Sequence, residues 1–162
     1  MERLLIIATG GTIDKIYFDD QSSYQVGEPQ ISETLRLMNV GFEYEIIALM
    51  RKDSLDLNDE DRERIRATVA GADTDHVLIT HGTDTMDATA AALGGIPGKT
   101  IVLTGALHPA RFHDSDAVFN IGCAIGAVQC LPEGAWIVMN GQVWEPGKVR
   151  KNRSMNRFEA IR

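Results

Sequence analysis

Short apolar segments recur along the chain, separated by stretches in which apolar and polar positions alternate. Their length and β-branched content predict buried strands, at residues 4–8, 43–50, 77–80, 100–104 and 136–139. The intervening patterns predict helices, at residues 32–38, 58–69, 86–93 and 114–129. Strands that alternate with helices predict an α/β fold of three layers, in which helices cover both faces of an open, mostly parallel sheet.

Capping and turn residues refine these elements. Ser32 is suited to cap the first predicted helix. Asn58 is suited to begin the second, because three acidic residues follow it at the positive end of the helix dipole. Residues 15–29 are polar and predict a mobile loop or a loose hairpin. Residues 141–145 predict an antiparallel edge strand.

Hydroxyl and small residues follow four of the predicted strands. These post-strand turns contain Thr12, Ser54, Thr83-Asp84 and Thr104-Gly105-Ala106. Right-handed crossovers place the carboxyl ends of parallel strands at one edge of the sheet, where open α/β sheets bind ligands. The sequence therefore predicts a polar cleft at that edge.

Composition narrows the class of protein. The 162 residues suit a single domain, and a net charge of −7 argues against a general nucleic-acid binder. The apolar runs are too short to span a bilayer. Residues 4–8 also lack the longer apolar core of a signal peptide, so we expect a cytoplasmic protein. Cys123 and Cys130 are expected to be buried free thiols on one face of a helix.

The hydroxyls predict acyl chemistry if a base can activate one of them. Candidate proton acceptors are Tyr17, Tyr24, Lys15, Lys148, Lys151 and Asp84. Gly10-Gly11 leaves backbone N–H groups close to Thr12, where they could stabilise an oxyanion. Asp84 could bind an ammonium group. This combination suits acyl transfer or hydrolysis of a small zwitterionic amide.

Other interpretations of these residues are weaker. The Gly10-Gly11 turn lacks the third glycine of a dinucleotide fingerprint and the lysine of a phosphate loop. His81 is expected to satisfy a hydrogen bond beside its turn. The spacing of His108, His113, Asp114 and Asp116 fits no standard zinc pattern. The basic run from Lys148 to Arg157 is expected to be a solvated tail unless one lysine turns into the cleft.

Two motifs together resemble the bacterial-type L-asparaginases. They are Ala8-Thr9-Gly10-Gly11-Thr12-Ile13 and His81-Gly82-Thr83-Asp84-Thr85-Met86. Further stretches are similar in the same order: Ser23-Tyr24-Gln25-Val26-Gly27, Asp53-Ser54 with Asp56-Leu57, Thr104-Gly105-Ala106 with Pro109, Asp116 and Asn120, and Val149-Arg150-Lys151. The resemblance covers nearly the whole chain.

The resemblance implies a role for each matching position. Thr12 would be the nucleophile that forms a β-aspartyl ester, and Tyr24 would help activate it. Thr83, Lys151 and Asp84 would form a second triad, with Asp84 also binding the substrate α-ammonium. The implied substrate-binding positions are Gly11, Asp53, Ser54, Gly82 and Ala106. Backbone N–H groups near Gly11 and Thr83 would form the oxyanion hole.

The sequence also differs from that family in length and at several positions. Its members are usually about twice this length, so we expect residues 1–162 to form a single catalytic domain, without the usual C-terminal domain. A neighbouring protomer normally supplies an acidic residue to the site, and Asp19, Asp20 and Glu28 are candidates to replace it. The family's pattern is also altered at Arg150, His108 and Ala117.

The resulting hypothesis is an L-asparaginase that converts L-asparagine to L-aspartate and ammonia without a metal or organic cofactor. We expect a homodimer or larger homo-oligomer, with no nucleic-acid or membrane partner, because another copy would complete an open cleft. The alternatives are a glutaminase-asparaginase of broader amide specificity, an amidotransferase component, and a non-catalytic protein that binds asparagine or aspartate.

Overall fold

A six-stranded sheet forms the centre of the computed structural model, which describes residues 1–18 and 23–161. The strand order is β4-β1-β5-β6-β7-β8. These strands are β1 (Arg3–Gly10), β4 (Glu43–Lys52), β5 (His76–Thr80), β6 (Thr100–Thr104), β7 (Gly134–Met139) and β8 (Gln142–Trp144). The first five are parallel, and β8 pairs antiparallel with β7. The predicted strands, including the antiparallel edge strand, are confirmed.

Strand β1 shows why the central strands are apolar without interruption. Leu5 and Ile7 pack into the core on one face of the sheet, whereas Leu4 and Ile6 pack into the core on the other. Successive side chains of a strand point to opposite faces, so a strand covered on both faces needs apolar residues at every position.

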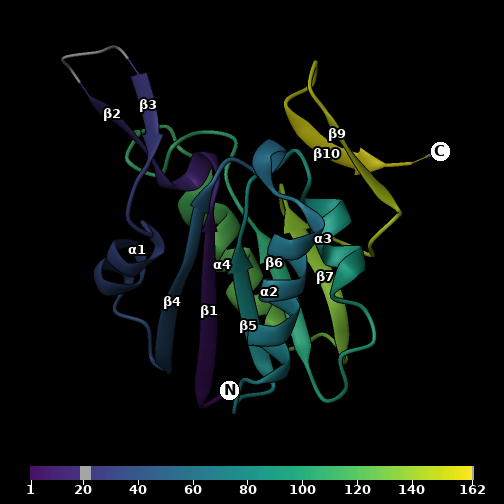
Figure 1. Ribbon diagram of the computed structural model, residues 1–162. Helices are drawn as coiled ribbons and strands as arrows, with labels where there is room; N and C mark the ends of the chain where they lie inside the picture. The colour runs from purple at the N-terminus through teal and green to yellow at the C-terminus, as the bar shows by residue number, and fades with distance from the viewer. Residues whose placement is uncertain (19–22, 162) are drawn as a thin grey trace.

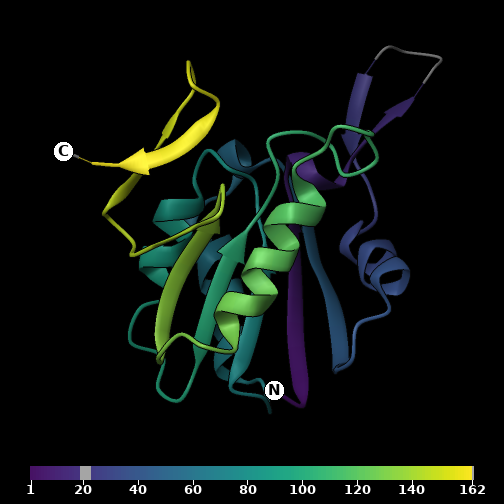
Figure 2. The same cartoon turned by 180° about the vertical axis from the view of Figure 1, so that it is seen from behind.

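Helices cover both faces of the sheet, as predicted. Helices α2 (Asp59–Ala70) and α3 (Met86–Ala92) lie on the face turned toward the viewer in Figure 1. Helix α4 (Ala117–Val128) lies on the opposite face, seen in Figure 2, and α1 (Ile31–Met38) packs its buried residues into the same core as α4. The three-layer α/β prediction is therefore confirmed.

The two predicted helix caps have different outcomes. Asn58 caps α2 through a capping box, because its side chain accepts from Asp61 N at 2.9 Å and the Asp61 carboxylate accepts from Asn58 N at 3.1 Å. The prediction that Ser32 caps α1 is wrong. Ser32 lies inside the first turn and donates to Pro29 O, and the cap position belongs to Gln30.

Helix α4 begins three residues later than predicted because the side chain of Asp116 binds the backbone of the preceding loop. Its carboxylate accepts hydrogen bonds from Leu107 N and His108 N, at 3.0 and 3.1 Å. The helix ends at Val128, so Cys130 lies beyond it and is exposed, and Cys123 is only partly covered. The expectation of two buried thiols on one helix face is therefore wrong.

Two antiparallel hairpins rise above the carboxyl edge of the sheet, one at each side (Figure 1). The first joins β2 (Lys15–Phe18) to β3 (Ser23–Val26), with Tyr17 opposite Tyr24, and confirms the loose-hairpin alternative. The second joins β9 (Val149–Asn152) to β10 (Arg157–Ala160). The segment is not a solvated tail, because Val149 and Phe158 are buried in the core beneath this hairpin. The stated exception applies instead, since Lys151 turns toward Asp84.

No helix within residues 1–18 and 23–161 has the length and apolar content that a membrane span requires.

Candidate active site

The post-strand turns meet at the carboxyl edge of the sheet, as the sequence predicts. A Cβ atom added to Gly11 would lie 2.4 Å from Gly82 Cα, and one added to Gly82 would lie 2.6 Å from Ser54 Cβ. Gly11 also has a φ of 86°, which disfavours any side chain. The turns after β1, β4 and β5 are thus in direct contact, which requires glycine at positions 11 and 82.

Hydrogen bonds fix these turns relative to one another. Ser54, in the short 3-10 helix η2 (Ser54–Asp56), is buried and accepts from Asp84 N at 3.2 Å. The Thr85 hydroxyl donates to Ser54 O at 2.7 Å. Gly11 N donates to Lys52 O at 2.9 Å, so this N–H is not available to a substrate oxyanion. Ser54 therefore has a structural role in addition to any contact with substrate.

The threonine hydroxyls at this edge divide into two groups. Those of Thr9, Thr85 and Thr104 donate to backbone carbonyls at 2.7–2.9 Å. Within the described residues, the hydroxyls of Thr12 and Thr83 make no hydrogen bond, and neither does that of Thr80, which is fully buried at the end of β5. Thr12 begins the short helix η1 (Thr12–Asp14) and is partly exposed, whereas Thr83 is 4% exposed. These two hydroxyls are free to react or to bind.

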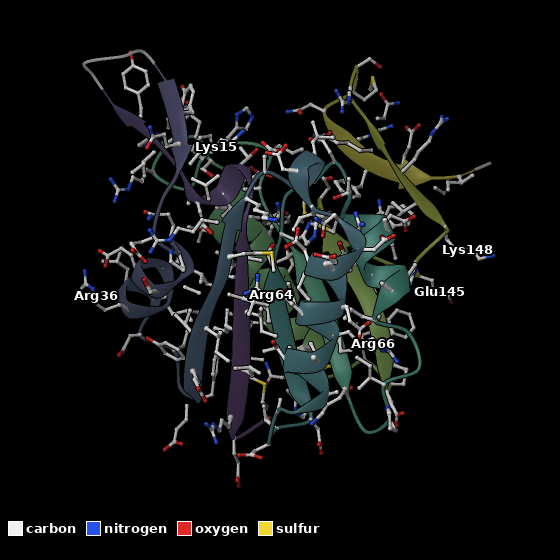
Figure 3. The ribbon with its side chains drawn as sticks, viewed as in Figure 1. Lys15, Arg36, Arg64, Arg66, Glu145 and Lys148 are labelled. Carbon is white, nitrogen blue, oxygen red and sulfur yellow. The ribbon has the colours of Figure 1, made fainter. Side chains whose placement is uncertain are left out.

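Asp84 lies beside Thr83 and pairs with two cations from the second hairpin. Lys151 Nζ lies 3.1 Å from Asp84 Oδ1, and Arg153 Nη2 lies 2.7 Å from the same oxygen. The side chains of Lys151 and Asp84 are about one-fifth exposed. Lys151 thus turns toward the cleft, whereas Lys148 is exposed and points away from the sheet (Figure 3).

Sequence reasoning did not single out Arg153. Arg153 lies in the turn that follows β9, so strand periodicity could not indicate its direction. Nothing in the basic run distinguished it from the other cations.

A second ion pair joins the first hairpin to η2. Lys15 Nζ lies 3.0 Å from Asp53 Oδ2, and Figure 3 shows Lys15 at the foot of the β2–β3 hairpin. Partial burial opposes ionisation of Asp53, but Lys15 and the N–H of Leu55 outweigh it and hold the pKa of this carboxyl below its ordinary value. Asp53 is therefore a charged, already paired group at the rim of the site.

Tyr24 lies on the exposed side of the same hairpin. Its ring centroid is 5.5 Å from that of Tyr17 and 6.3 Å from that of Phe112, and the residue is 52% exposed. The structure thus places Tyr24 in an aromatic group above the site, and the described residues include no hydrogen bond from it to Thr12. Of the candidate acids, Asp19 and Asp20 lie outside the described residues, and Glu28 pairs with Arg51.

The turn after β6 is held from behind by α4. Asn120 Nδ2 donates to Gly105 O at 3.0 Å and to Asp116 Oδ2 at 2.8 Å. Ala106 is 1% exposed and packs into the core that contains α4. Ala106 therefore has a buried side chain, and only its backbone could contact a ligand at this edge.

His81 is structural, as expected. Burial lowers its pKa to about 4, so the ring is neutral near pH 7. Its Nδ1 donates to Gly82 O at 2.7 Å, and its Nε2 lies 2.8 Å from the Thr89 hydroxyl. Across the parts of the chain that the structure describes, no three His, Cys, Asp or Glu side chains are grouped so that they could hold a metal ion.

Asp14 supports the hairpin that carries Tyr24. It is 1% exposed, its Oδ1 accepts from Gln30 N at 2.8 Å, and its carbonyl accepts from Gly27 N at 2.8 Å. Burial raises the pKa of this carboxyl to about 7, partly opposed by the Gln30 N–H and assisted by the charge of Glu28. One buried acid thus joins the two ends of the hairpin.

This burial predicts that stability falls as pH rises through the pKa of Asp14. Below about pH 4 both folded and unfolded chains hold the proton, between about pH 4 and 7 only the folded chain does, and above that neither does. Between pH 5 and 8 the contribution lost is about 3 kcal/mol in the free energy of unfolding. Urea unfolding of the parent chain and of Asp14→Asn at both pH values should show this loss as the change in their stability difference, because the opposite contribution of His81 is common to both chains. Glu63→Gln, on the exposed side of α2, should retain it.

A family model assigns the chain. The model for the asparaginase N-terminal region matches residues 3–162. The chain belongs to the asparaginase family. Its resemblance to that family is thereby confirmed, over nearly its full length.

Among asparaginase relatives, the L-asparaginase of Thermococcus kodakarensis is 28% identical over 170 residues, covering 98% of this chain and 51% of the relative. Its solved structure matches with a TM-score of 0.83 at 26% identity, over 98% of this chain and 51% of that one. The chain is also similar to a glutaminase-asparaginase of Pseudomonas fluorescens, at 26% identity over 93% of this chain and 46% of the relative.

One further relative carries a different name. It is a component of the glutamyl-tRNA(Gln) amidotransferase of Methanococcus vannielii, and it is 39% identical over 90 residues, covering 50% of this chain and 21% of the relative. The chain therefore spans about half the length of the asparaginases it matches and a smaller share of this amidotransferase component.

Proposed function

We propose that the protein is an amidohydrolase that converts L-asparagine to L-aspartate and ammonia. The observation that carries this proposal is the pair of unbonded hydroxyls, Thr12 and Thr83, beside the Asp84–Lys151 ion pair. A chain of the asparaginase family with intact motifs at these positions supports the same reaction. Residues 1–162 would act as one catalytic domain built on the central sheet.

The proposed reaction has two stages with Thr12 as nucleophile. The Thr12 oxygen bonds to the side-chain amide carbon, the carbon–nitrogen bond breaks, and the nitrogen leaves as ammonia with the proton that Thr12 gives up. Water then attacks the β-aspartyl ester, releasing aspartate and restoring the hydroxyl. Tyr24 would accept the Thr12 proton when the hairpin closes over the substrate.

Thr83, Asp84 and Lys151 would assist the second stage, in which water attacks the ester. Thr83 lies next to Asp84 in the chain, and Lys151 is held beside that carboxylate. A lysine so placed can carry a proton to or from Thr83 and the water, while Asp84 also binds the α-ammonium of the substrate. The N–H groups of Thr12 and Thr83 are the proposed oxyanion donors, because Gly11 N is committed to Lys52 O.

The remaining substrate contacts would come from residues at the same edge of the sheet. Ser54 and the adjoining backbone would hold the α-carboxylate, with Asp53 kept ionised at the rim by Lys15. Gly82 and Ala106 would line the floor. No step in this scheme requires a metal or organic cofactor.

Ammonia release from L-asparagine tests the proposal directly. We expect hydrolysis of L-asparagine in preference to L-glutamine, measured by a coupled ammonia assay on the purified chain. Equal rates on both amides would favour the glutaminase-asparaginase alternative, which the P. fluorescens relative suggests. Calorimetric binding of aspartate without any ammonia release would instead favour a binding protein.

Part of the similarity supports a second candidate. The match to the M. vannielii relative suggests an amidotransferase component that supplies ammonia to a partner. The assay separates the two, since such a component would release ammonia from L-asparagine weakly until its partner is added.

We also propose that the protein works in the cytoplasm as a homodimer or larger homo-oligomer. Val118 and Phe119 on α4 and Val143 on β8 are 45–59% exposed, and apolar side chains of this size favour self-association. Light scattering at working concentration should give at least twice the mass of one chain, and a fully active monomer would contradict the proposal. Cell fractionation tests the location.

A further inference from the structure

Arg153 extends from the turn between β9 and β10 onto Asp84. Its Nη2 lies 2.7 Å from Asp84 Oδ1, closer than the 3.1 Å between Lys151 Nζ and that oxygen. The two cations differ in exposure, because the Arg153 side chain is 73% exposed and that of Lys151 is 21% exposed. Lys151 is thus a built-in partner of Asp84, and Arg153 is an outer one.

The turn itself holds Arg153 in this place. Asn152 Oδ1 accepts hydrogen bonds from Ser154 Oγ at 2.8 Å and from Met155 N at 3.0 Å, which closes the turn around Arg153. Arg150, on β9, is bound instead to Glu159 on the paired strand. The hairpin therefore directs the Arg153 guanidinium toward the site.

Asp53, the neighbouring acid, is not free to bind a cation in place of Asp84. Asp53 is already paired with Lys15 at 3.0 Å. An incoming α-ammonium therefore meets an Asp84 carboxylate with two cations on one oxygen, and a third cation adds repulsion among them. Because exposed ion pairs are weak, the ammonium can displace the outer cation rather than be excluded.

We propose, on the basis of the function proposed above, that Arg153 is a specificity-determining residue that competes with the substrate α-ammonium for Asp84. It lowers the affinity for amides that carry a free α-amino group and leaves the affinity for desamino analogues unchanged. The preference for substrates with an α-amino group over those without one is therefore smaller than it would be if Arg153 were absent and only Lys151 paired with Asp84.

Two ligands that differ only in the ammonium group test this competition. L-aspartate and succinate have the same carboxylates, and succinate lacks the ammonium. In calorimetric titrations, Arg153→Gln should bind L-aspartate about fivefold more tightly than the parent chain and succinate equally well. Arg157→Gln removes the same charge from the same hairpin without touching Asp84, and it should change neither affinity by as much.

The possible outcomes separate this proposal from the function it rests on. Weaker binding of both ligands by Arg153→Gln would overturn it and make Arg153 a carboxylate-binding residue. Unchanged binding of aspartate would also overturn it, while hydrolysis of L-asparagine by the parent chain would leave the proposed function standing. If the parent chain neither binds aspartate nor releases ammonia, both proposals fail together.

Discussion

Thr12→Ala should lower kcat for ammonia release from L-asparagine by about a thousandfold or more, with little change in stability. The reason is that the proposed covalent route loses its attacking atom. The folded chain loses no hydrogen bond, because the Thr12 hydroxyl has no partner among the described residues. Steady-state ammonia assays and urea unfolding of the purified variant measure the two effects.

Thr9→Val is the matched control for this variant. Thr9 lies three residues earlier, is fully buried, and donates to Thr80 O at 2.9 Å. Replacing its hydroxyl by a methyl group should lower the free energy of unfolding by about 1 kcal/mol and retain most of the activity. Substantial turnover by Thr12→Ala would refute the nucleophile assignment, and so would an equal loss of activity in both variants.

Thr9 and Thr12 show what the sequence can predict and what it cannot, because one hydroxyl is hydrogen-bonded and the other is not. Their positions at the end of an apolar strand were readable from the local pattern. Which hydroxyl is committed to the fold was not, because the carbonyl that accepts from Thr9 is 71 residues away in the chain. Contacts of this kind depend on which strands become neighbours, and the sheet order places β5 beside β1.

The same division explains the errors in the fold prediction. The cap of α2 was predictable, since Asn58 and Asp61 are three residues apart. At α1, the cap-position N–H of Gln30 is bonded to Asp14, which precedes it by 16 residues, so Ser32 was a plausible but wrong choice. Local chemistry determines one helix start and a tertiary contact determines the other.

The second hairpin was missed because its exposed residues dominate its sequence. Arg150, Lys151 and Arg153 give the segment the composition of a solvated tail. Val149 and Phe158 nevertheless anchor it to the core from its two strands. Two apolar residues nine positions apart give no periodic signal, although they are sufficient to hold a short hairpin beside the site.

That anchoring leads to the second large effect, a selective loss of activity in Lys151→Ala. Its ammonium group lies 3.1 Å from Asp84 Oδ1 and 67 residues from it in the chain, so the hairpin places the proposed proton carrier beside Asp84. Its removal should lower kcat about a hundredfold or more, as expected for loss of a general acid or base.

Lys148→Ala is the matched control. It removes the same charge from an exposed position that points away from the sheet, and it should leave kcat within about twofold, as for an exposed residue that makes no contact with the site. Because Arg153 still neutralises Asp84 when Lys151 is absent, the fold should persist, and circular dichroism can verify this. Equal losses from both lysine substitutions would show that general positive charge, rather than a positioned ammonium, supports the reaction.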